Sequence, residues 1–117
     1  MSENTAPSPE KDTVLIADDS ELNREILVGI LGDNYNYILA EDGVQAIEKM
    51  SLGMEVSIVL LDVNMPNMDG FGVLKVMNNR HWLDEIPVII ISADSDADCI
   101  KTAYELGASD YITRPFN

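Results

Sequence analysis

Short apolar runs alternate along the chain with stretches in which apolar residues recur at helical spacing. Five apolar runs predict strands at residues 13–17, 35–40, 56–61, 87–91 and 110–113. Between them, four stretches with apolar residues three or four positions apart predict helices at 21–31, 43–50, 70–79 and 96–106. A strand–helix alternation of this kind predicts βαβ units, a parallel sheet and a single α/β domain.

Local signals place the helix starts and the centre of the sheet. Ser20 and Asp42 are the expected N-caps of the first two helices, and Gly70 opens the third. Run 56–61 is the most apolar and is expected to be the central strand, because strands covered on both faces read as continuous apolar runs. The first helix carries an apolar face formed by Leu22, Ile26, Leu27, Ile30 and Leu31.

The sequence predicts a different structure for each end of the chain. Residues 1–12 are polar and contain proline, and we expect a flexible leader before a domain at 13–117. A fifth helix is expected to begin at Pro115, since proline favours a first helical turn, but only Phe116 and Asn117 follow. We therefore expect a truncated fifth helix and a partly bare sheet face. Either the chain is a fragment of a longer protein, or another element covers that face.

Composition narrows the functional classes. The net charge is −14, from 21 acidic and 7 basic residues, which argues against binding nucleic acid or an anionic membrane. No run approaches the roughly 18 apolar residues that span a bilayer, and the first residues lack a secretory signal. The single cysteine, Cys99, fits a reducing compartment, so the cytoplasm is the expected location.

Candidate chemistry gathers where the strands end, since ligands of open parallel sheets sit outside the carboxyl ends of the strands. Those ends carry Asp18 and Asp19, Asp62, Ser92 and Arg114. Three carboxylates held together repel and need a counter-charge. A hard divalent cation with oxygen ligands supplies it, and Mg²⁺ suits a small site that keeps several waters.

The order and spacing of these residues resemble the receiver domains of response regulators in two-component signalling. The resemblance covers residues 13–116 and rests on the acidic pair at 18–19, Leu60-Leu61-Asp62, the segment 64–70 (Asn-Met-Pro-Asn-Met-Asp-Gly), Ser92-Ala93 and the segment 111–116. It implies a flavodoxin-like, doubly wound five-stranded parallel sheet of order 2-1-3-4-5. It also implies that Asp62 accepts a phosphoryl group from a histidine kinase or phosphotransfer protein.

The same resemblance implies a metal site and a switch. Mg²⁺ would be bound by Asp19, Asp62 and the backbone carbonyl of Asn64, and through water by Asp18. Ser92 resembles the hydroxyl that bonds the new phosphoryl group, and Tyr111 the aromatic that then turns inward. The added charge, about −1.5 to −2, would draw Ser92 toward it and relay the change to an output domain or a partner protein.

Several interpretations stay open. Arg114 stands where the family has lysine, so a degenerate, phosphate-independent interaction module is an alternative. Asn64 and Asp94 occupy positions that tune dephosphorylation in this family, although Asp94 equally reads as a solvated acid. A haloacid-dehalogenase type of phosphatase would need aspartate at Asn64 and a cap segment, so we expect no enzyme beyond self-phosphorylation and self-dephosphorylation. Dimerisation is left open.

Overall fold

The computed structural model describes residues 8–115. All five predicted strands and four predicted helices are present among these residues. The strands are β1 (Asp12–Ala17), β2 (Tyr35–Ala40), β3 (Ile58–Leu61), β4 (Val88–Ser92) and β5 (Asp110–Thr113). The helices are α1 (Glu21–Leu31), α2 (Gly43–Met50), α3 (Gly70–Asn79) and α4 (Ala97–Glu105), with short 3-10 turns at Gly32–Asn34 and Trp82–Asp84.

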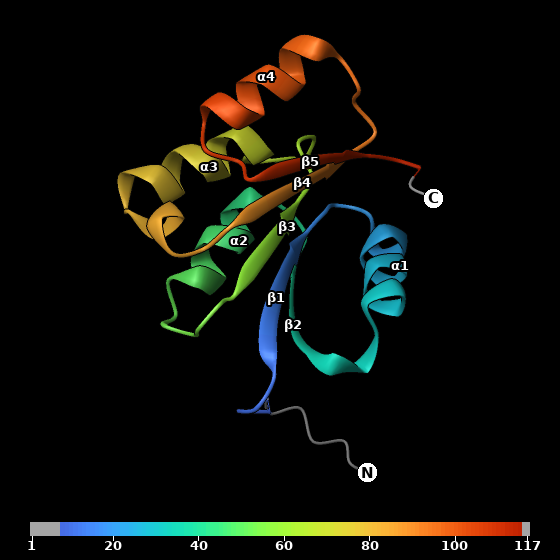
Figure 1. Cartoon of the computed structure of the whole chain (residues 1–117), viewed down its shortest axis with the longest axis vertical. Helices are drawn as coiled ribbons and strands as arrows, with labels where there is room; N and C mark the ends of the chain where they lie inside the picture. The colour runs from blue at the N-terminus through green and yellow to red at the C-terminus, as the bar shows by residue number, and fades with distance from the viewer. Residues whose placement is uncertain (1–7, 116–117) are drawn as a thin grey trace.

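The strands form one parallel sheet in the order β2-β1-β3-β4-β5, as the family resemblance implies (Figure 1). β3 is central as predicted, although it begins at Ile58, two residues later than expected. The register aligns Ala17 with Ala40 and with Leu61, so β1, β2 and β3 end at the same level. Residues that directly follow these strands are therefore brought together at one edge of the sheet.

Local capping explains where the helices begin. The Ser20 hydroxyl accepts a hydrogen bond from Asn23 N at 3.2 Å, and Asp42 accepts one from Gln45 N at 2.8 Å. Both side chains satisfy amides that the first helical turn leaves unpaired, as the N-cap rule predicts. Asp69 caps α3 in the same way, through Gly72 N at 2.8 Å.

The two faces of the sheet are covered unequally. Helices α2, α3 and α4 lie on one face and α1 lies on the other (Figure 1). The larger core fills the first face and contains fully buried side chains such as Leu61, Leu74, Met77 and Ile90. Each such side chain contributes roughly 1.5–3 kcal/mol through removal from water, so most of the hydrophobic stabilisation is on this face.

The apolar stripe of α1 is only partly covered by the described residues. Leu27 packs against the sheet and is buried, but Leu22, Ile26 and Ile30 are 65%, 43% and 61% exposed. This agrees with the expectation of a partly bare face. The predicted fifth helix was expected to begin at Pro115, which forms a bend and not a helical turn, and the next two residues, 116–117, lie outside the described residues.

The first residues described lie beside the edge strand β2. Residues 1–7 of the predicted leader lie outside the described residues, and β1 already begins at Asp12. The backbone of Ser8 is hydrogen-bonded to the Asn36 side chain at 2.9 and 2.8 Å, so this part of the predicted leader lies against β2. Within residues 8–115, none of the helices has the length and apolarity that crossing a bilayer requires.

Candidate metal centre

Asp18 and Asp62 are placed by extensions of the sheet ladder. Asp18 N donates to Ala40 O at 3.1 Å, and Asp62 N donates to Ala17 O at 2.9 Å. The hydrogen bonds therefore continue one residue beyond the ends of β1 and β3. Both carboxylates are anchored by backbone that belongs in effect to the sheet.

Three carboxylates meet at this edge. Asp18, Asp19 and Asp62 each offer an oxygen atom that lies within 4.8 Å of the others. Asp18 and Asp62 are buried, whereas Asp19 is exposed to solvent. The structure thus brings together the three acids expected from the sequence, and one of them is open to water.

The Asp18 carboxylate is oriented by the start of α1. Its Oδ1 accepts a hydrogen bond from Ser20 N at 2.9 Å, and Arg24 Nη1 donates to the Asp18 carbonyl at 2.6 Å. Arg24 was not predicted from the sequence as a residue of the site. Its position one turn into a helix that starts beside Asp19 is the signal that could have found it.

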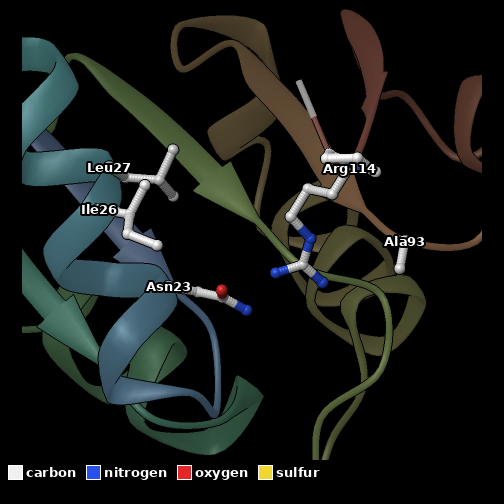
Figure 2. A pocket seen from close by; sticks show the side chains of 6 residues that line it. Asn23, Ile26, Leu27, Ala93 and Arg114 are labelled. Carbon is white, nitrogen blue, oxygen red and sulfur yellow. The ribbon is translucent and has the colours of Figure 1, made fainter. Parts of the chain in front are cut away.

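Arg114 enters the site from the end of β5. Its Nη1 lies 3.1 Å from Asp18 Oδ2, and its Nη2 lies 3.5 Å from Asp62 Oδ2. One guanidinium therefore bridges two buried carboxylates, which a lysine ammonium cannot do with the same planar geometry. Figure 2 shows this side chain reaching into an otherwise mostly apolar hollow, between Asn23, Ile26 and Leu27 of α1 and Ala93 after β4.

The positive charge of Arg114 does not fully compensate the negative charge of the buried carboxylates, as the pKa of Asp62 indicates. Burial raises the pKa of Asp62, and the nearby Asp18 charge raises it further, against the opposing effect of Arg114. Asp62 Oδ1 is buried and has no partner of ordinary hydrogen-bond geometry among the described residues. An orphaned carboxylate oxygen beside two more carboxylates fits a hard divalent cation such as Mg²⁺.

The loop between β3 and α3 forms the opposite side of the site. Asp19, Asn64, Met65, Pro66 and Asp69 line one shallow, open pocket, so the expected ligand Asn64 faces the same space as Asp19. Gly70 N donates to Val63 O at 2.8 Å and closes the base of the loop. A Cβ at Gly70 would lie 2.4 Å from Asp62 O, so only glycine permits this approach.

Ser92 and Tyr111 lie on the next two strands. Ser92 is fully buried, and its hydroxyl accepts a hydrogen bond from Asp94 N at 3.2 Å. The half-buried Tyr111 donates from its hydroxyl to the Asp94 carbonyl at 2.6 Å and lies 3.3 Å from Cys99 Sγ. Tyr111 therefore already packs against the core in this structure, while its role in a switch stays a prediction.

Comparisons with known proteins agree with the fold. The pattern of the response regulator receiver domain family matches residues 14–117. The chain is 37% identical over 105 residues to response regulator RR06 of Streptococcus pneumoniae, covering 89% of this chain but only 46% of that protein. It is 34% identical to the two-component response regulator ORR3 of Oryza sativa over 98% of this chain and 88% of that one.

A solved structure shares the arrangement of the elements. A CheX–CheY complex of Borrelia burgdorferi with BeF3 and Mg²⁺ matches with a TM-score of 0.79 and 33% identity, covering 91% of this chain and 80% of that chain. The family match spans most of the chain and includes all the strand-end residues described above. The chain therefore belongs to the response regulator receiver domain family.

Proposed function

We propose that this chain is a phosphoacceptor signalling switch in which Asp62 takes a phosphoryl group from a phosphohistidine of a histidine kinase or phosphotransfer protein. The observation that carries the proposal is the buried Asp62 carboxylate at the end of the central strand, whose Oδ1 has no hydrogen-bond partner within residues 8–115. Asp18, Asp19, Asp62 and the Asn64 carbonyl would hold Mg²⁺. Bound there, Mg²⁺ would neutralise phosphoryl oxygens and help to orient the group.

In the transfer step an Asp62 oxygen attacks phosphorus. The bond from phosphorus to the donor imidazole nitrogen breaks, and its electron pair leaves with that nitrogen. That nitrogen takes up a proton from water, and the products are an aspartyl phosphate and a free histidine side chain. Arg114, 3.5 Å from Asp62 Oδ2, supplies positive charge next to the group being transferred. Water would later hydrolyse the mixed anhydride, so the chain would catalyse only its own phosphorylation and dephosphorylation.

The signal would leave the site through Ser92 and Tyr111. Ser92 would exchange its bond with Asp94 N for one with a phosphoryl oxygen. The Asp94 loop also accepts the Tyr111 hydroxyl, so a movement of this loop would change the packing of Tyr111. The output would be another domain of a longer chain or a separate protein. Nucleic acid is not proposed as a direct partner, because Asp96 and Asp98 make the start of α4 acidic.

One observation favours a second candidate, a phosphate-independent interaction module. Arg114 already pairs with Asp18 and Asp62 and so competes with a metal for the same oxygens. In such a module the guanidinium would be a permanent internal counter-ion. The site would then stabilise the fold without taking part in phosphoryl transfer.

Intact-mass analysis after incubation with acetyl phosphate and Mg²⁺ tests the proposal. Wild type should gain one phosphoryl group, and Asp62→Asn should gain none. Labelling that persists unchanged in Asp62→Asn would remove Asp62 as acceptor. If wild type stays unlabelled while Arg114→Lys is labelled, the phosphate-independent module is the correct account.

A further inference from the structure

The loop between β3 and α3 is tied to the start of α2 by two hydrogen bonds. Asn67 Nδ2 donates to Asp42 Oδ2 at 2.6 Å, and Gly43 N donates to Met68 O at 3.0 Å. We refer to these four residues, Asp42, Gly43, Asn67 and Met68, as the loop clasp. Asp42 and Gly43 are buried, although neither has a part in the chemistry proposed above.

The geometry of the loop clasp restricts which residues can occupy its positions. A Cβ on Gly43 would lie 2.4 Å from Met68 O, so the close approach of helix and loop requires glycine. Asn67 has φ +68°, a left-handed conformation that asparagine adopts more readily than most residues. Met68 N donates to Pro66 O at 2.7 Å, which makes the turn around Asn67 tight. The Asp42 carboxylate can only accept, so the donor facing it is the Asn67 amide nitrogen.

The clasp lies three residues from a candidate metal ligand. Asn64, Met65 and Pro66 run between two fixed points, the Val63–Gly70 hydrogen bond at the base of the loop and the clasp at Asn67. The short segment is therefore held at both ends. Its direction decides where the Asn64 carbonyl points relative to Asp19 on the other side of the pocket.

We propose that the loop clasp sets the position of the Asn64 carbonyl, and that Asp42 and Asn67 are positioning residues of the metal centre. The inference rests on the proposed function, because it assumes that this carbonyl binds Mg²⁺. Residues that orient metal ligands without touching the metal typically change metal affinity by 10- to 100-fold when they are removed. One carbonyl held by one side-chain pair corresponds to the lower end of that range.

Calorimetric titration of the purified chain with MgCl₂ tests the proposal in three variants. Asn67→Asp sets two carboxylates against each other, and Asn67→Gly removes the side chain but keeps the left-handed backbone accessible. Both should bind Mg²⁺ about tenfold more weakly than wild type. The added charge of Asn67→Asp would by itself favour a cation, so weaker binding cannot come from charge alone. The double variant Asp42→Asn/Asn67→Asp exchanges donor and acceptor at unchanged net charge and should recover most of the affinity.

Gln45→Ala is the matched control. It removes the Gln45 Oε1 contact to Glu41 N at 2.9 Å, at the same end of α2 but outside the loop clasp. Its Mg²⁺ affinity should stay within about twofold of wild type. Urea unfolding of each variant separates a general loss of stability from a loss of metal binding.

Weaker binding in both Asn67 variants with recovery in the double variant supports the clasp. Affinity within twofold of wild type in both single variants, or a loss that the double variant does not recover, would overturn it while leaving the acceptor role of Asp62 intact. A wild-type chain that binds no Mg²⁺ would overturn the proposed function and the clasp together.

Discussion

Asp62→Asn should make the metal-free protein more stable, although it destroys the proposed acceptor. The Asp62 carboxylate is 5% exposed, lies near Asp18 and Asp19, and leaves Oδ1 unpaired among the described residues. Burial and the Asp18 charge raise its pKa above the ordinary value for aspartate. A raised pKa of an acid means that its ionised form destabilises the folded state at neutral pH.

The size of the effect follows from the site geometry. With an effective dielectric constant of about 20, the Arg114 contact at 3.5 Å contributes roughly 5 kcal/mol of attraction. Repulsion from the Asp18 carboxylate, which lies within 4.8 Å, offsets at least about 3.5 kcal/mol of that attraction. The small remaining attraction is offset by the unpaired Oδ1, which costs about 1–3 kcal/mol or more for a charged group. We expect Asp62→Asn to be about 1 kcal/mol more stable than wild type.

Urea unfolding followed by the fluorescence of Trp82, which packs against the core, measures this difference. The advantage of the variant should be largest near neutral pH. It should shrink as pH falls through the raised pKa of Asp62 and vanish near the ordinary aspartate pKa of about 3.9, because the wild-type carboxyl group is then protonated as well. Glu48→Gln, which removes a charge from the exposed face of α2, should change stability by less than about 0.5 kcal/mol.

Addition of Mg²⁺ should reverse the order of stability. Mg²⁺ at 100 times its dissociation constant would stabilise wild type by about 2.7 kcal/mol, whereas the variant has lost one ligand and gains less. A metal-free Asp62→Asn that is less stable than wild type at neutral pH would show that Arg114 over-compensates the buried charge. That result would refute the electrostatic account of the site.

Three further predictions address separate contacts. Gly70→Ala places a Cβ 2.4 Å from Asp62 O and should destabilise the chain by roughly 1–3 kcal/mol in urea unfolding. An unchanged unfolding midpoint would show that the loop adapts freely. Tyr111→Phe removes the hydroxyl bond to the Asp94 carbonyl and should cost about 1 kcal/mol in the same assay, so a neutral effect would mean that this bond contributes nothing. Arg114→Lys releases one of the two bridged carboxylates and should raise the initial rate of labelling by acetyl phosphate several-fold. A slower rate would indicate that the guanidinium itself assists transfer.

The sequence predicted the elements of the fold and the grouping of three carboxylates for a clear physical reason. Parallel strands that end at one level bring the residues after them together, so Asp18, Asp19 and Asp62 could be grouped from strand ends alone. The register of β1 with β3 confirms that grouping. Strand boundaries were less accurate: Val56 is buried like a strand residue although β3 begins only at Ile58.

The contacts that sequence could not predict join segments far apart in the chain. Asp42 was predicted only as a helix cap, and its second oxygen meets Asn67, 25 residues away. Likewise the charge of Arg114 was expected at the site, but its bridging of two carboxylates depends on side-chain directions that no periodicity encodes. Helical spacing identified the apolar stripe of α1, yet it could not say which of those residues a neighbouring element covers.

The central claim is that Asp62 carries the phosphoryl group. Reduction of the acyl phosphate with borohydride, after incubation with acetyl phosphate and Mg²⁺, converts the acceptor aspartate to homoserine. Peptide mapping by mass spectrometry then locates that residue in the chain. We predict homoserine at position 62, dependent on Mg²⁺ and absent without acetyl phosphate. Homoserine at position 18 or 19, or none at any position in a chain that binds Mg²⁺, would contradict the account.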